Sequence, residues 1–267
     1  GCKLSSSRGP STAPKGESLR WAGTENGDSV CFPMDASHFL GRSLNAAHAT
    51  EHCRPQSAAE LAADKAVHLF GIATAVPAAA LLVSFSAQSS DGLKLTAILL
   101  YVAGLGAMLG CSAAYNLVRE HWCRPVLRRC DHAAIFAMIA GSYTPFTLLS
   151  WSDGWSGSLT TIIWALALCG IALKFLAPAR GLRTLSALPY LLLGWIGLSA
   201  IFPLLTTLGP QTFSLIVLGG LFYSVGVLFH VWDSLPFQNS IWHGFVLAGA
   251  ATHYIAILNG VVLAPTV

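Results

Sequence analysis

From residue 58 to the end of the chain, apolar stretches of near-spanning length alternate with short polar connectors. An α-helix needs about 20 mostly apolar residues to cross the hydrocarbon core of a bilayer. Each connector contains Gly, Pro, Asp or Ser, which are typical of turns between helices. The pattern therefore predicts an all-α fold, a seven-transmembrane helix bundle, with spans at about 66–85, 95–117, 132–149, 158–176, 185–205, 212–231 and 241–263.

Residues 1–57 have a different pattern, rich in Ser, Gly, Pro, Asn and Thr, with no apolar run of more than a few residues. Such a segment buries too little apolar surface to offset the entropy lost on ordering. We therefore predict a disordered cytoplasmic segment over 1–57 and a seven-helix membrane domain over 58–267. The opening residues, Gly1-Cys2-Lys3-Leu4-Ser5, fit a myristoylation acceptor beside a cysteine for palmitoylation, or else an arbitrary start.

Composition supports the membrane interpretation. Hydrophobic residues make up 54% of the chain and charged residues 10%, against about 25% charged in ordinary soluble domains. These values exclude a disordered chain, a nucleic-acid binder and a coiled coil, and they argue against a soluble enzyme. We expect an integral, multi-pass membrane protein whose partners are membrane lipids and not nucleic acid. Composition does not distinguish the plasma membrane from an internal one and indicates no particular cytoplasmic partner.

The positions of Lys and Arg predict the orientation of the bundle. One side holds the basic residues of the N-terminal segment and of the connectors at 118–131 and 177–183, whereas the other side holds only Lys94. Loops rich in Lys and Arg stay in the cytoplasm. The N-terminus is therefore expected inside and the C-terminus outside.

In this orientation, many polar side chains lie at the cytoplasmic ends of the spans. Five separate stretches contribute: Glu60, Asp64 and His68; Ser112 and Asn116; Asp131 and His132; His230; and Asn239 and His243. Ionisable residues within spans are costly to insert, so each is a functional hypothesis. Their convergence at one depth predicts a polar or metal-binding pocket near the cytoplasmic face.

Helical spacing indicates which polar residues can share this pocket and excludes His253 from it. Asp64 and His68, like Asn239 and His243, are four residues apart and share a helix face. His253 lies ten residues beyond His243, about 15 Å further along a helix. We expect His253 to be a hydrogen-bonded core residue and not a ligand of the same metal.

Four segments, which follow one another along the chain, carry more specific motifs. They are Glu60–His68, Ser112–Asn116 (SAAYN), Asp131–Phe146 (DHAAIFAMIAGSYTPF) and Ile241–Gly249 followed by His253. They resemble the first, second, third and seventh helices of the hemolysin III family, part of the progestin and adipoQ receptor superfamily that includes the adiponectin receptors. Asp64 stands where that family usually has Asn. The resemblance covers roughly residues 58–263.

The resemblance implies a seven-helix bundle, N-terminus inside, with a zinc site near the cytoplasmic face. In the adiponectin receptors three histidines hold the zinc, and the matching positions here are Asn116, Asn239 and His243. Asp131 matches the acidic residue that helps to hold the bound water, and Ser112 opens the second-helix motif. Two expected histidines are thus asparagines, whose amide oxygens are poor zinc donors. We expect a weakened or absent zinc site, or one rebuilt with another histidine, such as His68.

Three functions are compatible with these residues. We favour a receptor-like or lipid-sensing membrane protein with a degenerate zinc site in a cytoplasmic-side pocket. The first alternative is a zinc-dependent intramembrane lipid amide hydrolase of the ceramidase kind, with His243 as ligand and with Asp131 and Ser112 as catalytic residues. The second is a membrane-permeabilising hemolysin. The sequence leaves open whether the protein is an enzyme, which lipid it would use and how many copies assemble.

Overall fold

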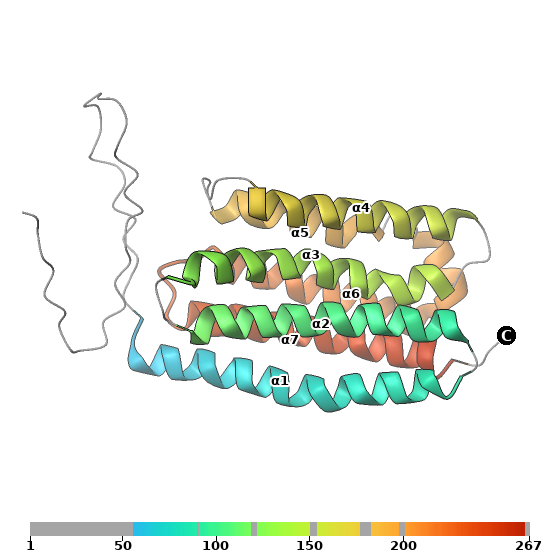
Figure 1. Ribbon diagram of the computed structural model, residues 1–267, viewed down its shortest axis with the longest axis horizontal. Coiled ribbons are helices and arrows are strands. Elements are labelled where there is room, and N and C mark those ends of the chain that lie inside the picture. The colour runs from blue at the N-terminus through green and yellow to red at the C-terminus, as the bar shows by residue number, and fades with distance from the viewer. Residues whose placement is uncertain are drawn as a thin grey trace, which may run out of the picture. The chain divides into compact units, whose positions relative to one another are not determined.

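The computed structural model describes residues 56–89, 91–118, 122–149, 154–176, 183–197 and 201–264. Within these residues the chain forms α-helices and no strands (Figure 1). The helices are α1 (Ala58–Ala87), α2 (Gly92–Leu117), α3 (Arg124–Leu149), α4 (Gly154–Leu176), α5 (Arg183–Trp195), α6 (Ile201–His230) and α7 (Gln238–Ile257), and a short π-helix, η2 (Leu258–Val262), continues α7. The segment predicted to be disordered, except for residues 56 and 57, lies outside the described residues, as does the lipidation motif.

Five stretches within these helices are long and apolar enough to cross a membrane: Ala58–Ala87, Gly92–Leu117, Gly157–Leu176, Leu208–His230 and Gln238–Val262. Large apolar side chains on them point outward; Phe70 is 64% exposed and Leu228 is 64% exposed. Outward apolar side chains suit a protein whose solvent is lipid. The prediction of an all-helical bundle with seven helices is confirmed, whereas the side on which each end lies stays a prediction.

The predicted fifth span is not one continuous helix in the structure. The sequence suggested one span at 185–205 and a connector at 206–211. In the structure, α5 already ends at Trp195, and α6 runs from Ile201 to His230 with one non-helical residue inside it, Gly209 (φ 73°, ψ 161°). Glycine adopts this positive φ without a steric penalty, and Pro210 can begin the following helix because its missing N–H is not needed there. Gly209 therefore separates two helical stretches within α6, and it lies inside the connector predicted at 206–211.

The first and last helices close the bundle. Helix α1 contacts both α2 and α7, α2 packs against α3, α3 against α4, and α6 against α7 (Figure 1). The core includes the fully buried side chains of Leu82, Ile98, Tyr101 and Ile257. Because α1, α2 and α7 are neighbours, the polar ends of these three helices meet.

His253 links two helices inside the core. Its Nε2 donates a hydrogen bond to the carbonyl oxygen of Ile216 at 3.0 Å, and its ring packs beside Tyr223. The bond joins α7 to α6 and satisfies a polar group that would be costly in an apolar interior. The prediction that His253 is a hydrogen-bonded core residue is confirmed.

Helices α2 and α3 approach each other closely at Gly104. A Cβ atom there would lie 2.8 Å from the carbonyl oxygen of Ala137, whereas a Cβ at Gly106 would meet nothing within 4 Å. We expect Gly104→Ala to lower the free energy of unfolding by about 1–3 kcal/mol, the usual cost of overpacking. Gly106→Ala, the matched control, is expected to be neutral or stabilising. Denaturant unfolding in detergent measures both, and equal stability of the two variants would contradict this packing.

Candidate metal centre

Helix α1 begins with a complete capping box. The Ser57 hydroxyl accepts from the Glu60 backbone N–H at 3.2 Å, and the Glu60 carboxylate accepts from the Ser57 N–H at 2.7 Å. Such reciprocal bonds satisfy two backbone donors and define where the helix starts. From this start, the four-residue spacing puts Asp64 and His68 on the same buried face as Glu60.

The same glutamate connects α1 to α7. Its Oε1 accepts a hydrogen bond from the backbone N–H of Phe237 at 2.8 Å. Phe237 has a left-handed backbone conformation (φ 57°), which is uncommon for a large side chain, and it directly precedes the first turn of α7. The contact aligns the beginnings of the two helices, so Asn239 and His243 lie level with Asp64.

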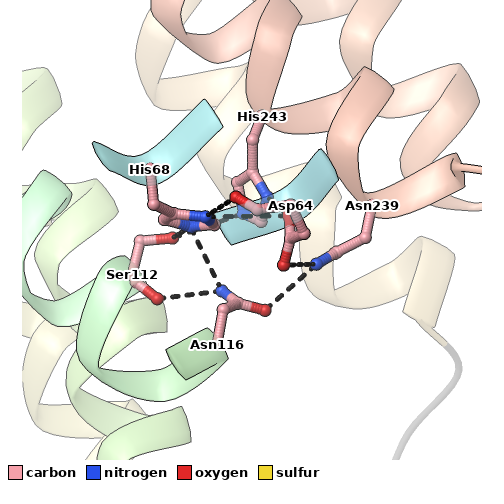
Figure 2. A network of polar contacts seen from close by, with 6 residues as sticks. All are labelled: Asp64, His68, Ser112, Asn116, Asn239 and His243. Atoms are coloured by element: carbon pink, nitrogen blue, oxygen red, sulfur yellow. Dashed lines mark hydrogen bonds and ion pairs between the residues drawn. The ribbon is translucent and has the colours of Figure 1, made fainter. Parts of the chain in front are cut away.

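Asp64 is the centre of a hydrogen-bond network at this level (Figure 2). Its Oδ1 accepts from His243 Nδ1 at 2.9 Å and its Oδ2 accepts from Asn239 Nδ2 at 2.9 Å. Its backbone carbonyl accepts from His68 Nδ1 at 2.8 Å. One residue therefore holds both imidazoles by Nδ1, and the Nε2 atom of each ring is left for another partner.

The two Nε2 atoms share a neighbour on α2. Ser112 Oγ lies 3.3 Å from His68 Nε2 and 3.3 Å from His243 Nε2, and the centres of the two rings are 4.3 Å apart. The carboxyl of Asp131, on α3, interacts with the Ser112 side chain and electrostatically with His243. Four helices thus contribute side chains to one small region.

Two asparagines complete the network. Asn116 Nδ2 donates to the Ser112 carbonyl at 2.9 Å and approaches His68 Nε2 at 3.5 Å, while its Oδ1 accepts from Asn239 Nδ2 at 3.0 Å. Asn239 Nδ2 makes its other bond to Asp64. Both amides therefore act here as hydrogen-bonding groups that hold Asp64 and His68.

A possible metal site lies within the network. In the part of the chain that the structure describes, Asp64, His68 and His243 are the one group of three or more His, Cys, Asp or Glu side chains that could hold a metal, with ligand atoms within 4.8 Å of one another. The Asp64 and His68 side chains are 8% and 4% exposed, and His243 is 12% exposed. Two imidazoles and a carboxylate form a common zinc ligand set, so these residues fit the ion.

The predicted site residues separate into two groups. His68, Ser112, Asn116, Asn239 and His243 meet in one network, and Asp131 borders it through Ser112. His132 and His230, also considered from the sequence, are not in the metal-ligand group: the His132 carbonyl accepts from the Tyr190 hydroxyl at 3.1 Å, and the His230 ring packs on Trp242.

Asp64 is the site residue that sequence reasoning missed as a candidate ligand. Two signals pointed to it, namely its four-residue spacing from His68 and its departure from the asparagine usual in the resembling family. Neither signal predicted that its carboxylate would lie 2.9 Å from His243, because that distance depends on how α1 and α7 pack.

Comparison with known proteins assigns the family. The family model described as "Haemolysin-III related" matches residues 63–254, most of the chain and the whole sequence interval from Asp64 to His253. The chain belongs to this family. It is 33% identical to a protein named "Hemolysin-3 homolog" from Bacillus subtilis (strain 168) over 196 residues, which covers 73% of this chain and 92% of the relative.

Two further relatives extend the family across kingdoms. "Hemolysin-3" of Bacillus cereus is 33% identical over 196 residues, covering 73% of this chain and 89% of the relative. "Monocyte to macrophage differentiation factor" of Homo sapiens is 31% identical over 215 residues, covering 78% of this chain and 87% of the relative. The family and the helices together identify an integral, multi-pass membrane protein and confirm the resemblance found in the motifs.

Glu60 is expected to position the metal-ligand group in this haemolysin-III related protein. Glu60→Ala removes an acceptor of the Phe237 N–H, and we expect the free energy of unfolding to fall by about 1–3 kcal/mol because a buried donor loses its partner. Metal affinity should fall as well, since α7 loses its alignment with α1. Glu60→Gln keeps one carbonyl oxygen as an acceptor, so it should recover part of the stability and part of the metal affinity.

The control for Glu60 is Lys65→Ala, an exposed change on the same helix that should leave both quantities within error. Stability is measured by denaturant unfolding in detergent, and metal affinity by competition with a zinc chelator. A Glu60→Ala protein with unchanged zinc affinity would show that the Glu60–Phe237 contact does not position the ligands.

Proposed function

We propose that this protein is a zinc-dependent membrane hydrolase that cleaves an ester or amide bond of a lipid. The observation that carries the proposal is the meeting of Asp64, His68 and His243 within 4.8 Å at one end of the bundle. Compared with the ligand positions implied by the resemblance, His243 is retained and two residues of α1 replace the asparagines. The site is then not degenerate but built from different helices.

The hydrogen bonds of the two imidazoles support metal binding. Histidines that bind metals usually donate their second ring N–H to a carboxylate or a backbone carbonyl, which orients the ring and fixes the tautomer. His243 Nδ1 donates to the carboxylate of Asp64, and His68 Nδ1 donates to its carbonyl oxygen. Both Nε2 atoms therefore face Ser112 and are available as ligands, while Asp64 orients the two imidazoles. Direct binding of the ion by the Asp64 carboxylate requires that it release the His243 N–H.

The residues around the ligands suit hydrolysis. A zinc ion held there supplies Lewis acidity. The Ser112 hydroxyl, between the two Nε2 atoms, can hold the polar group of a substrate by hydrogen bonding. The Asp131 carboxyl next to Ser112 can accept a proton from the attacking water and then give it to the leaving group of the cleaved ester or amide. Zinc is favoured over calcium because nitrogen ligands predominate.

The test combines metal analysis with an activity assay. The chain is purified in detergent without added metal, analysed for zinc, and reconstituted with N-acylsphingosine and with phosphatidylcholine as amide and ester substrates. We expect about one zinc per chain and a release of fatty acid that chelation abolishes and zinc restores. A protein that binds no zinc after incubation with the ion would overturn the proposal.

A metal-free lipid receptor is the second candidate, and one observation favours it. The amide hydrogens of Asn116 and Asn239 are all directed at acceptors within the network, which is therefore well connected without an ion. In this case the pocket would bind a lipid head group. Zinc analysis separates the two candidates, because only the hydrolase requires the ion.

A further inference from the structure

The surface between α1 and α7 carries a groove that the proposed chemistry does not use. Its volume is about 500 Å³, within the range of about 300–1,000 Å³ typical of ligand sites. Ala66, Val67 and Phe70 of α1 and Gly244, Ala248 and Ala251 of α7 line it. All of these side chains are apolar, so the groove suits an apolar occupant.

The lining residues give the groove its shape. Gly244 leaves it open, because a Cβ atom there would meet nothing within 4 Å. Leu247, Ala248 and Ala251 continue the α7 side along the helix, and Phe70, 64% exposed, stands on the α1 side. An open apolar groove with a projecting aromatic ring accommodates a flexible hydrocarbon chain better than a whole helix, which needs a close, even approach of backbones.

The groove begins at the depth of the metal-ligand group along α1 and α7. Val67 directly precedes His68, and Gly244 directly follows His243. Ala251 lies eight residues after His243, about 12 Å along the helix axis. The groove therefore extends from the level of the two imidazoles toward the middle of the bundle, on a surface that lies within two of the spanning stretches.

We propose that this groove holds one hydrocarbon chain of a bilayer lipid, with the polar group of that lipid at the level of His68 and His243. The proposal deepens the proposed function, on which its account of the polar group rests, by defining the substrate as a lipid that enters sideways between α1 and α7. Occupancy of the groove by the chain stands on the apolar lining, on its place within two spanning stretches and on its start at the depth of the polar site.

The experiment uses a phosphatidylcholine whose acyl chain carries a photoactivatable diazirine. The full chain is reconstituted in vesicles containing this lipid, irradiated and digested, and the labelled residues are identified by mass spectrometry. We expect adducts within 66–70 and 244–251. Gly244→Phe fills the groove and should lower labelling there about tenfold, the effect of about 1.4 kcal/mol in binding.

Gly106→Phe is the matched control. Gly106 is also an exposed glycine of a spanning helix with open space around its Cβ position, but it belongs to α2 and does not line the groove. It should leave labelling of 66–70 and 244–251 unchanged. Adducts spread evenly over the exposed helices, or labelling that Gly244→Phe does not reduce, would overturn the proposal.

Two measurements distinguish this proposal from the proposed function. Groove labelling in a protein that binds no zinc would uphold the lipid groove and overturn the hydrolase. Zinc binding without selective labelling of the groove would overturn the lipid groove and leave the hydrolase standing. A Gly244→Cys variant tests the competing occupant, since efficient disulfide-linked dimers in vesicles would show that a second copy of the chain covers the groove and would overturn the lipid assignment.

Discussion

His243→Ala is expected to lower zinc affinity by more than about 100-fold, because loss of a direct ligand exceeds the about 10–100-fold effect of losing an outer partner. His243 is the residue on which the ligand positions implied by the resemblance and those found in the structure agree. Its Nδ1 is held by Asp64 at 2.9 Å, so its Nε2 cannot turn away without breaking that bond. Zinc content after dialysis against a chelator measures the loss.

The chain offers a matched control for this change. His253 lies on the same helix and donates to the Ile216 carbonyl, away from the metal-ligand group. His253→Gln keeps a donor for that carbonyl and should retain zinc at the wild-type level. If His243→Ala and His253→Gln lost zinc equally, the loss would reflect general destabilisation and the assigned ligand would be wrong.

His68→Ala is expected to remove zinc about as completely as His243→Ala, whereas Asn116→Ala should keep most of it. This contrast separates two ligand sets that share His243. In the set proposed here, His68 is a ligand and Asn116 is only a hydrogen-bonding neighbour, with its Nδ2 3.5 Å from His68 Nε2. Removing the Asn116 amide, which competes for the lone pair of His68 Nε2, should therefore lower zinc affinity little.

Zinc titration of the two variants, followed by competition with a chelator, decides between the sets. Both proteins should first be shown to unfold at similar denaturant concentrations, so that a loss of zinc is not a loss of fold. Strong zinc binding by His68→Ala together with weak binding by Asn116→Ala would reverse the assignment and return the site to the positions implied by the resemblance.

Most of the fold could be predicted because the bilayer limits what a chain can do. Each crossing requires about 20 apolar residues, and this length separates neighbouring spans clearly where charged connectors intervene, as at residues 118–131. The prediction was wrong at Trp195, where α5 ends inside the predicted span 185–205 and no charge marks the end of the helix. The connector predicted at 206–211 does contain a break, at Gly209, where a glycine is followed by a proline.

The site was predictable as a group of residues but not as a geometry. Helical spacing put Asp64 beside His68 and Asn239 beside His243, since those relations are local. Whether the two pairs face each other depends on the packing of α1 against α7. The contact that aligns them joins Glu60 to Phe237, which are 177 residues apart in the chain. No periodicity reports such a long-range contact, so Asp64 became a candidate ligand only in the structure.

The closure of the bundle by α1 and α7 has a consequence for biosynthesis. The ribosome makes α1 well before α7, so the metal-ligand group cannot assemble until α7 has entered the membrane. A chain released before Gln238 contains neither Asn239 nor His243. Uptake of the ion would then mark the insertion of α7, and the bound ion would link a helix made early to one made much later.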